Sequence, residues 1–167
     1  TAEAMCRDPL VVYPGCTQGR NIRESGKKGV CFVTFNPAEG SLPAAASTEF
    51  VPCDAVRWKS GELSISSMDR EEDFFQAVSM LKEKTRAMND GLPMLLRLSL
   101  SGRGEMHSLL RRPGFLKGPG GLMETLNEGE EDRSDFVFIE EIVDETAPSL
   151  DLEALASGGH LVGDFLR

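Results

Sequence analysis

The chain has 167 residues, of which 40% are hydrophobic and 27% charged, and its formal net charge at pH 7 is -9. This is the composition of an ordinary globular protein, long enough to bury roughly 70% of its unfolded surface. The acidic balance excludes a surface that is a nucleic-acid footprint throughout, because phosphate binding requires Lys and Arg. Any contact with DNA must therefore be local.

The cysteines and the apolar runs indicate the compartment. Cys6, Cys16, Cys31 and Cys53 form neither a CxxC nor a CxxH pair, so their spacing predicts no zinc or dithiol site and favours reduced thiols. No apolar run approaches the roughly 18 residues of a membrane span, and no signal-peptide pattern is present. We expect a cytoplasmic protein without membrane contact. Because the chain reads from Asp8 onward as the middle of a strand-rich region, we also expect it to be a fragment.

Three strands are predicted in the first third of the chain. Leu10 to Tyr13 is a short run rich in β-branched residues that Pro14 and Gly15 close, and Val30 to Phe35 is the next. Residues 36 to 47 form a long hairpin loop or a linker. Thr48 to Trp58 is predicted as a third strand, broken at Pro52 because proline cannot donate to a ladder. These strands are expected to form the edge of a larger sheet.

A helix is predicted after Met68. Asp69 can cap it, and Glu72 stands three residues later in capping-box spacing. Apolar and small residues then recur at helical intervals at Phe74, Val78, Leu81, Thr85 and Met88. Gly91 is predicted to end this helix.

The rest of the chain alternates strands and helices. Leu92 to Ser101 is predicted as a buried strand that Arg97 interrupts, and residues 105 to 112 and 122 to 127 as short helices on either side of a glycine-rich turn. Asp135 to Val143 is predicted as the last strand. Leu161, Val162, Phe165 and Leu166 have the spacing of one more short helix. The fold class predicted from this order is α+β.

One segment carries a specific motif. It contains Tyr13, Pro14, Gly15, Gln18, Gly19, Arg20, Glu24, Gly26, Lys28 and Gly29. This segment resembles the YPG-x-x-QGR-x-x-x-E-x-G-x-KG stretch of bacterial DNA repair exonucleases of the SbcD/YhaO type, in the calcineurin-like metallophosphoesterase superfamily. Two later stretches, Val56-Arg57-Trp58 and Leu96 to Gly102 with His107 and Leu110, are similar to further blocks of that family. Met106 and Cys16 depart from its pattern.

The resemblance implies a domain division. Residues 1–66 would be the closing strands of a phosphoesterase domain, and residues 67–167 a C-terminal accessory domain of the capping type. The parent enzyme would be a metal-dependent exonuclease whose two manganese ions clamp the attacking and leaving oxygens of a DNA phosphodiester. In the family the metal ligands lie upstream of YPG, and this chain has only His107 and His160, which have no second histidine at ligand spacing. We therefore expect no catalytic, cofactor or metal site and no enzymatic activity in this fragment.

Two basic stretches are candidates for DNA contact. The first is a loop with Arg20, Arg23, Lys27 and Lys28, and the second contains Arg97, Arg103, Arg111, Arg112 and Lys117 against Glu105 alone. From Glu124 to Glu145 the balance reverses, with ten acids against Arg133. This asymmetry suggests that one face of the second domain meets DNA and the other faces solvent or protein. The alternative is that both stretches are merely solvated.

The partners follow from the resemblance. DNA would bind weakly, and an ATPase of the SbcC kind or a second copy of the chain would be a further partner. A different class of function also fits: an acidic protein-interaction adaptor without a role in nucleic-acid binding, in which the motif blocks only build the fold.

Overall fold

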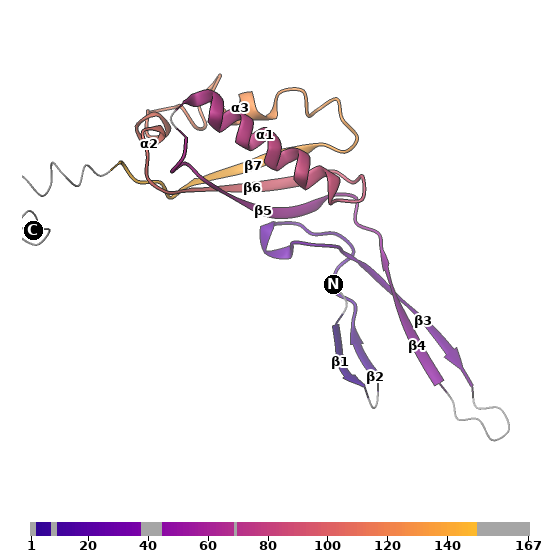
Figure 1. The fold of residues 1–167 in the computed structure, drawn as a ribbon. Coiled ribbons are helices and arrows are strands. Elements are labelled where there is room, and N and C mark those ends of the chain that lie inside the picture. The colour runs from indigo at the N-terminus through magenta and orange to yellow at the C-terminus, as the bar shows by residue number, and fades with distance from the viewer. Residues whose placement is uncertain (1–2, 8–9, 38–44, 69, 150–167) are drawn as a thin grey trace, which may run out of the picture.

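The computed structural model describes residues 3–7, 10–37, 45–68 and 70–149. Two small hairpins precede a layer of three strands that is covered by helices on one face, as Figure 1 shows. This mixture of strands and helices confirms the predicted α+β class. The predicted cap Asp69 and the apolar residues from Leu161 to Leu166 lie outside the described residues.

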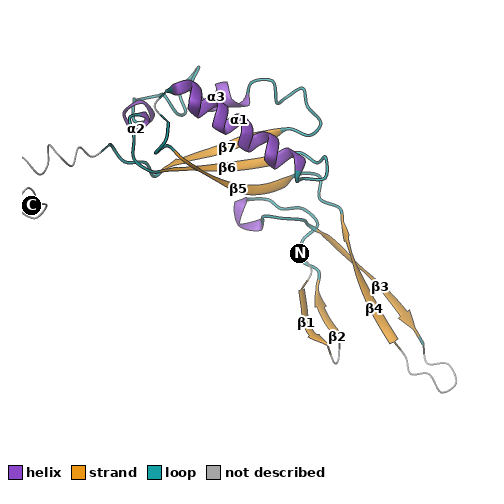
Figure 2. Ribbon diagram, in the orientation of Figure 1, coloured by secondary structure: helices purple, strands orange, loops and turns teal. Residues whose placement is uncertain are grey.

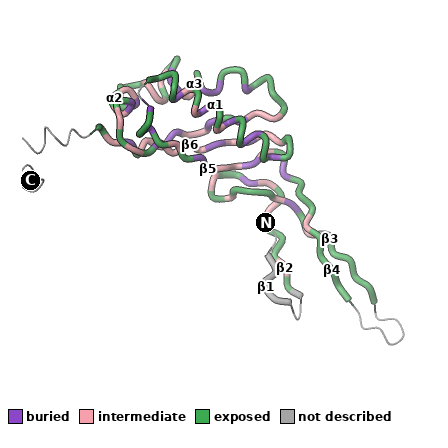
Figure 3. Tube along the Cα trace, in the orientation of Figure 1, coloured by how far each residue is buried: buried purple, intermediate pink, exposed green. Residues whose placement is uncertain are grey.

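The first strands form two separate hairpins. β1 (Glu3–Arg7) pairs antiparallel with β2 (Leu10–Tyr13), and β3 (Gly29–Asn36) pairs antiparallel with β4 (Ala45–Pro52). Figure 3 shows the β3–β4 hairpin exposed along most of its length. The sequence prediction missed β1. Within the described residues each hairpin is a sheet of its own, so the predicted single edge of a larger sheet is not seen there.

The predicted strand from Thr48 to Trp58 is two strands. β4 ends at Pro52, where the ladder loses a donor, and β5 (Arg57–Ser64) begins after a four-residue turn and joins a different sheet. The break at Pro52 was predicted. The change of sheet was not, because it depends on which strand β5 meets later in the chain.

The main sheet has three parallel strands in the order β5–β6–β7. β6 (Met94–Ser101) lies between β5 and β7 (Val137–Asp144) and pairs in parallel with both. Parallel neighbours need crossover connections. The first crossover contains α1 (Glu71–Ala87), and the second contains α2 (Met106–Leu110) and α3 (Leu122–Asn127). Figure 2 shows these helices above one face of the sheet.

The core lies between the helices and that face. Residues of β6 alternate along the strand, with Met94, Leu96, Leu98 and Leu100 buried. From α1, Phe74 and Val78 are fully buried against them. The sequence suggested that Arg97 interrupts this strand. It does not, because Arg97 lies on the face of β6 opposite to the buried residues.

The start and end of α1 differ from the prediction. The N-cap is Arg70, whose backbone N–H donates to the side chain of Asp73 at 3.2 Å, so Glu72 does not take the capping-box role. The helix ends at Ala87. Met88 is consequently outside it and 57% exposed, whereas the rest of the predicted stripe is buried or half-buried.

A buried ionic cluster joins α1 to the segment before β7. Glu130 is 7% exposed, and its carboxylate receives Lys82 at 2.7 Å and Arg86 at 2.8 Å. It also accepts the backbone N–H of Val137 at 2.7 Å. Burial alone would raise the pKa of Glu130, but the hydrogen bonds from Lys82, Val137 and Arg86 outweigh it and hold this pKa below its usual value.

The predicted division after residue 66 stays a prediction. β5, on the near side of that division, forms one sheet with β6 and β7 on the far side.

Candidate nucleic-acid interface

The side chain of Gln18 anchors the first basic loop to the segment before β5. Its carbonyl oxygen accepts the backbone N–H of Ala55 at 2.9 Å and of Val56 at 3.3 Å, and its amide donates to the carbonyl of Val56 at 2.6 Å. One glutamine thus binds the backbone groups that a neighbouring strand would otherwise pair. This gives the Gln of the motif a structural role.

Gly19 and Trp58 hold the same loop against β5. The indole N–H of Trp58 donates to the carbonyl of Gly19 at 3.1 Å. A Cβ at Gly19 would lie 2.7 Å from the carbonyl oxygen of Glu24 and 3.3 Å from the Trp58 ring, so no larger residue fits without a shift. The loop that presents the first set of cations is therefore fixed at its base.

The four predicted cations of this loop differ in their surroundings. Arg20 is exposed and pairs with Glu24 at 3.4 Å. Arg23, in the short helix η1 (Ile22–Glu24), is exposed, and its side chain has no partner among the described residues. Lys27 pairs with Asp90 at 2.8 Å. Lys28 is half-buried. The structure thus leaves Arg20 and Arg23 most open to an anionic partner.

Arg57 ties the loop, β5 and the end of α1 together. Its side chain is 6% exposed and binds Asp54 at 2.7 Å and Asp90 at 2.9 Å. Burial lowers the pKa of Arg57, but the hydrogen bonds with Asp54 and Asp90 outweigh it and raise this pKa above its usual value. Hydrogen bonds from Lys27 and Arg57 lower the pKa of Asp90 to about 2. The carboxylate of Asp90 therefore stays charged and joins two cations from distant parts of the chain.

The second basic stretch meets the acidic stretch in space. Arg97 binds Glu140 and Glu141, each at 2.8 Å, from the neighbouring strand β7. Arg111 pairs with Asp144 at 3.2 Å. The expectation that opposite charges occupy different faces therefore fails for these cations. Parallel pairing of β6 with β7 brings Arg97 beside Glu140 and Glu141, and Arg111, at the end of α2, reaches Asp144 at the end of β7. Arg103 and Arg112 are exposed, and Arg103 donates to the carbonyl of Pro148 at 3.3 Å.

His107 is engaged locally. Its Nδ1 lies 2.9 Å from the hydroxyl of Thr146, which donates to Asp144 at 2.6 Å. The imidazole of His107 is thus bound to a neighbouring hydroxyl group. Within the described residues no group of three or more His, Cys, Asp or Glu side chains could hold a metal ion, and no helix is long and apolar enough to cross a membrane.

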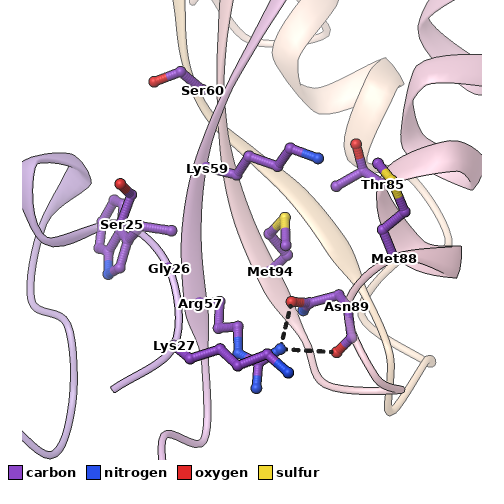
Figure 4. A pocket seen from close by; sticks show the side chains of 11 residues that line it. Ser25, Gly26, Lys27, Arg57, Lys59, Ser60, Thr85, Met88, Asn89 and Met94 are labelled. Carbon is purple, nitrogen blue, oxygen red and sulfur yellow. Dashed lines mark hydrogen bonds between the residues drawn. The ribbon is translucent and has the colours of Figure 1, made fainter. Parts of the chain in front are cut away.

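Beside the first loop lies a cleft of about 460 Å³ that the sequence analysis missed. It lies between residues 25–27, the first half of β5 and the end of α1, as Figure 4 shows. Lys59, Ser60 and Thr85 are among its lining residues. No pattern in the sequence indicated this cleft, because Lys59 lies just beyond the strand that was predicted to end at Trp58, and a single lysine does not by itself predict a cleft.

Comparison with known proteins places this arrangement in a class. Residues 58–147 match the family model described as the middle domain of metallophosphoesterase YhaO. The chain is also 31% identical over 147 residues to a Bacillus subtilis (strain 168) protein, the uncharacterized metallophosphoesterase YhaO. That match covers 88% of this chain and 33% of the relative. No solved structure matches the chain.

The chain thus carries a metallophosphoesterase-related domain, and it belongs to the YhaO family. This confirms the resemblance seen in the sequence. The matched model describes a middle domain, so the C-terminal position predicted from the sequence stays a prediction.

Proposed function

We propose that this chain is a non-catalytic part of a metal-dependent DNA repair exonuclease, with its first basic loop on the path of the DNA. The observation that carries the proposal is the placement of Arg20 and Arg23. Both are exposed on a loop whose base Gln18 and Trp58 hold against β5. A fixed loop with open guanidinium groups can meet phosphates at little cost in conformational entropy.

The remaining parts of the proposal follow from the family. The catalytic centre of the whole enzyme would hold two manganese ions, and an ATPase of the SbcC kind or a second copy would be its protein partner. Arg97 and Arg111 form ion pairs with acidic residues of β7. Within the second basic stretch, DNA binding therefore depends mainly on Arg103 and Arg112, which are exposed.

Duplex DNA binding by the 167-residue chain is expected to be weak, salt-sensitive and indifferent to sequence, because its only recognition groups are clustered cations. Changing Arg23→Glu should weaken binding and lower the slope of log affinity against log salt by about 1, the value of one phosphate contact. Fluorescence anisotropy over a salt series measures both.

The matched control is Lys84→Glu, which reverses the charge of an exposed lysine on α1 that has no side-chain partner within the described residues. Arg112→Glu tests the second stretch in the same assay. Equal effects of Arg23→Glu and Lys84→Glu would exclude the loop from the footprint. Absence of duplex binding even at low salt would favour the acidic adaptor instead.

The purified chain is expected to show no nuclease or phosphatase activity with manganese. Its sequence contains two histidines and none of the family's ligand motifs, and a two-metal site needs several ligands. Release of acid-soluble nucleotides from duplex DNA is the measurement. Manganese-dependent cleavage that disappears in His107→Ala would contradict the proposal.

A further inference from the structure

The cleft beside the first loop has an unusual charge for this chain. Its lining residues include three cations, Lys27, Arg57 and Lys59, and no carboxylate, although the chain carries 27 acidic residues and a net charge of -9. Lys27 and Arg57 are engaged with Asp90, which lies next to the lining. The electrostatics of the cleft interior are therefore set by the third cation.

The side chain of Lys59 has no hydrogen bond or ion pair within the part of the chain that the structure describes. It is half-buried, and Figure 4 shows its side chain extending from β5 toward α1, where Thr85 and Met88 stand opposite. A partly desolvated ammonium without a counter-charge is costly unless an anion joins it. An anion bound in the cleft would therefore supply the counter-charge for the Lys59 ammonium.

Thr85 and Ser60 also line the cleft and carry further donor groups. Thr85 is 1% exposed, and its hydroxyl oxygen is buried without a hydrogen-bond partner in the described residues. Backbone groups add to it: the N–H of Arg57 bonds to the carbonyl of Pro93 toward β6, whereas the carbonyl of Trp58 faces the other way and accepts from Gly26. By the alternation of a strand, the N–H of Ser60 also faces away from β6, on the side where β5 has no neighbouring strand.

Apolar side chains complete the lining. Met88, which follows α1 beside Thr85, and Met94 of β6 both line the cleft, and methionine side chains adapt to flat rings. A cation with further donors and polarizable methionines nearby fits a phosphate ester that carries a heterocycle.

We propose that this cleft binds the phosphate group of a nucleotide, either free or at the end of a nucleic-acid strand, with the Lys59 ammonium as its principal contact. The ligand class rests on the proposed function. The position of the site rests on the lining of the cleft alone.

The test uses the whole chain and a short single-stranded oligothymidylate labelled at its 3′ end, in one form with a 5′-phosphate and in another with a 5′-hydroxyl. The 5′-phosphorylated strand should bind more tightly. Lys59→Gln should lower its affinity about tenfold, the worth of one charge-assisted hydrogen bond, and leave the 5′-hydroxyl strand within about twofold. Lys84→Gln, with the same change of charge on the exposed side of α1, should leave both unchanged.

Thymidine 5′-monophosphate as competitor separates the two sources of phosphate. Competition supports a site for free nucleotides, and a preference for the 5′-phosphorylated strand without competition supports a strand end. The proposed phosphate site would be wrong if Lys59→Gln and Lys84→Gln changed the affinity for the 5′-phosphorylated strand equally. It would also be wrong if there were neither a preference for the 5′-phosphate nor competition by the mononucleotide. If Arg23→Glu still weakens duplex binding in that case, the proposed function stands and only this site is lost.

Discussion

Changing Glu130→Gln is expected to lower the free energy of unfolding by about 3 kcal/mol, because it leaves the buried ammonium of Lys82 and the buried guanidinium of Arg86 without their shared counter-charge. The new side chain has nearly the same shape and can still accept the N–H of Val137, so the loss reports charge rather than packing. For a chain of this size the melting temperature should fall by about 6–12 °C, measured by calorimetry at pH 7.

Glu131→Gln is the matched control, since Glu131 is the exposed neighbour in the sequence. Its melting temperature should stay within about 2 °C of that of the unchanged chain, as for most surface substitutions. Equal losses in both variants would mean that net charge, and not the buried cluster, determines the effect.

The effect of Glu130 should also depend on pH in a definite direction. Its pKa in the folded state lies below the usual value of 4.5, so its contribution to stability is complete above that value. As the pH falls through the folded pKa, the carboxylate is protonated and this contribution disappears. The difference between the unchanged chain and Glu130→Gln should therefore be constant near neutral pH and shrink below about pH 4.5. A difference that grows toward acid would contradict this assignment.

Arg57→Gln is expected to cost about 3–5 kcal/mol, because Asp54 has a fully buried side chain and would lose its only ion-pair partner among the described residues. One oxygen of Asp54 already lacks a hydrogen bond, so the carboxylate has little else to stabilise it. The same change removes a link from Asp90 to β5. Denaturant unfolding measures the loss.

A double-mutant cycle separates the charge from the packing. Asp54→Asn in the Arg57→Gln background removes the stranded charge and should restore about 1–3 kcal/mol relative to Arg57→Gln alone. Arg112→Gln, at an exposed arginine, should change stability by less than about 0.5 kcal/mol. Strictly additive effects at Arg57 and Asp54 would exclude their coupling.

The ion pair has a consequence for the interface. Asp90 joins Lys27 of the basic loop to Arg57 of β5, and Gln18 joins the same loop to the backbone before β5. The loop is thus held at one end by its own Gln18 and at the other by Asp90, which lies in the region that the family model covers. A substitution that removes the ion pairs of Arg57 should therefore also weaken DNA binding and alter the cleft. The stability of each variant must be measured before its affinity for duplex DNA or for the oligothymidylate is interpreted.

The amino-acid sequence by itself determined the local elements. The alternation in β6, the apolar spacing of α1 and the glycine-rich turn between α2 and α3 are short-range patterns that a few consecutive residues specify. The motif from Tyr13 to Gly29 was enough to indicate the family, which the comparisons confirm. The motif is a set of residue types at fixed spacing, so it can be recognised without knowing the fold.

Only the tertiary structure decided which strands and charges meet. A segment of 29 residues separates the end of β5 at Ser64 from the start of β6 at Met94. No local sequence pattern indicates that these two strands pair in parallel. The same pairing logic places Arg97 beside Glu140 and Glu141 and so cancels a charge asymmetry that the linear sequence displays. The cluster around Glu130 and the cleft at Lys59 likewise arise from residues far apart in the chain, because burial and counter-charges are properties of packed neighbours and not of sequence order.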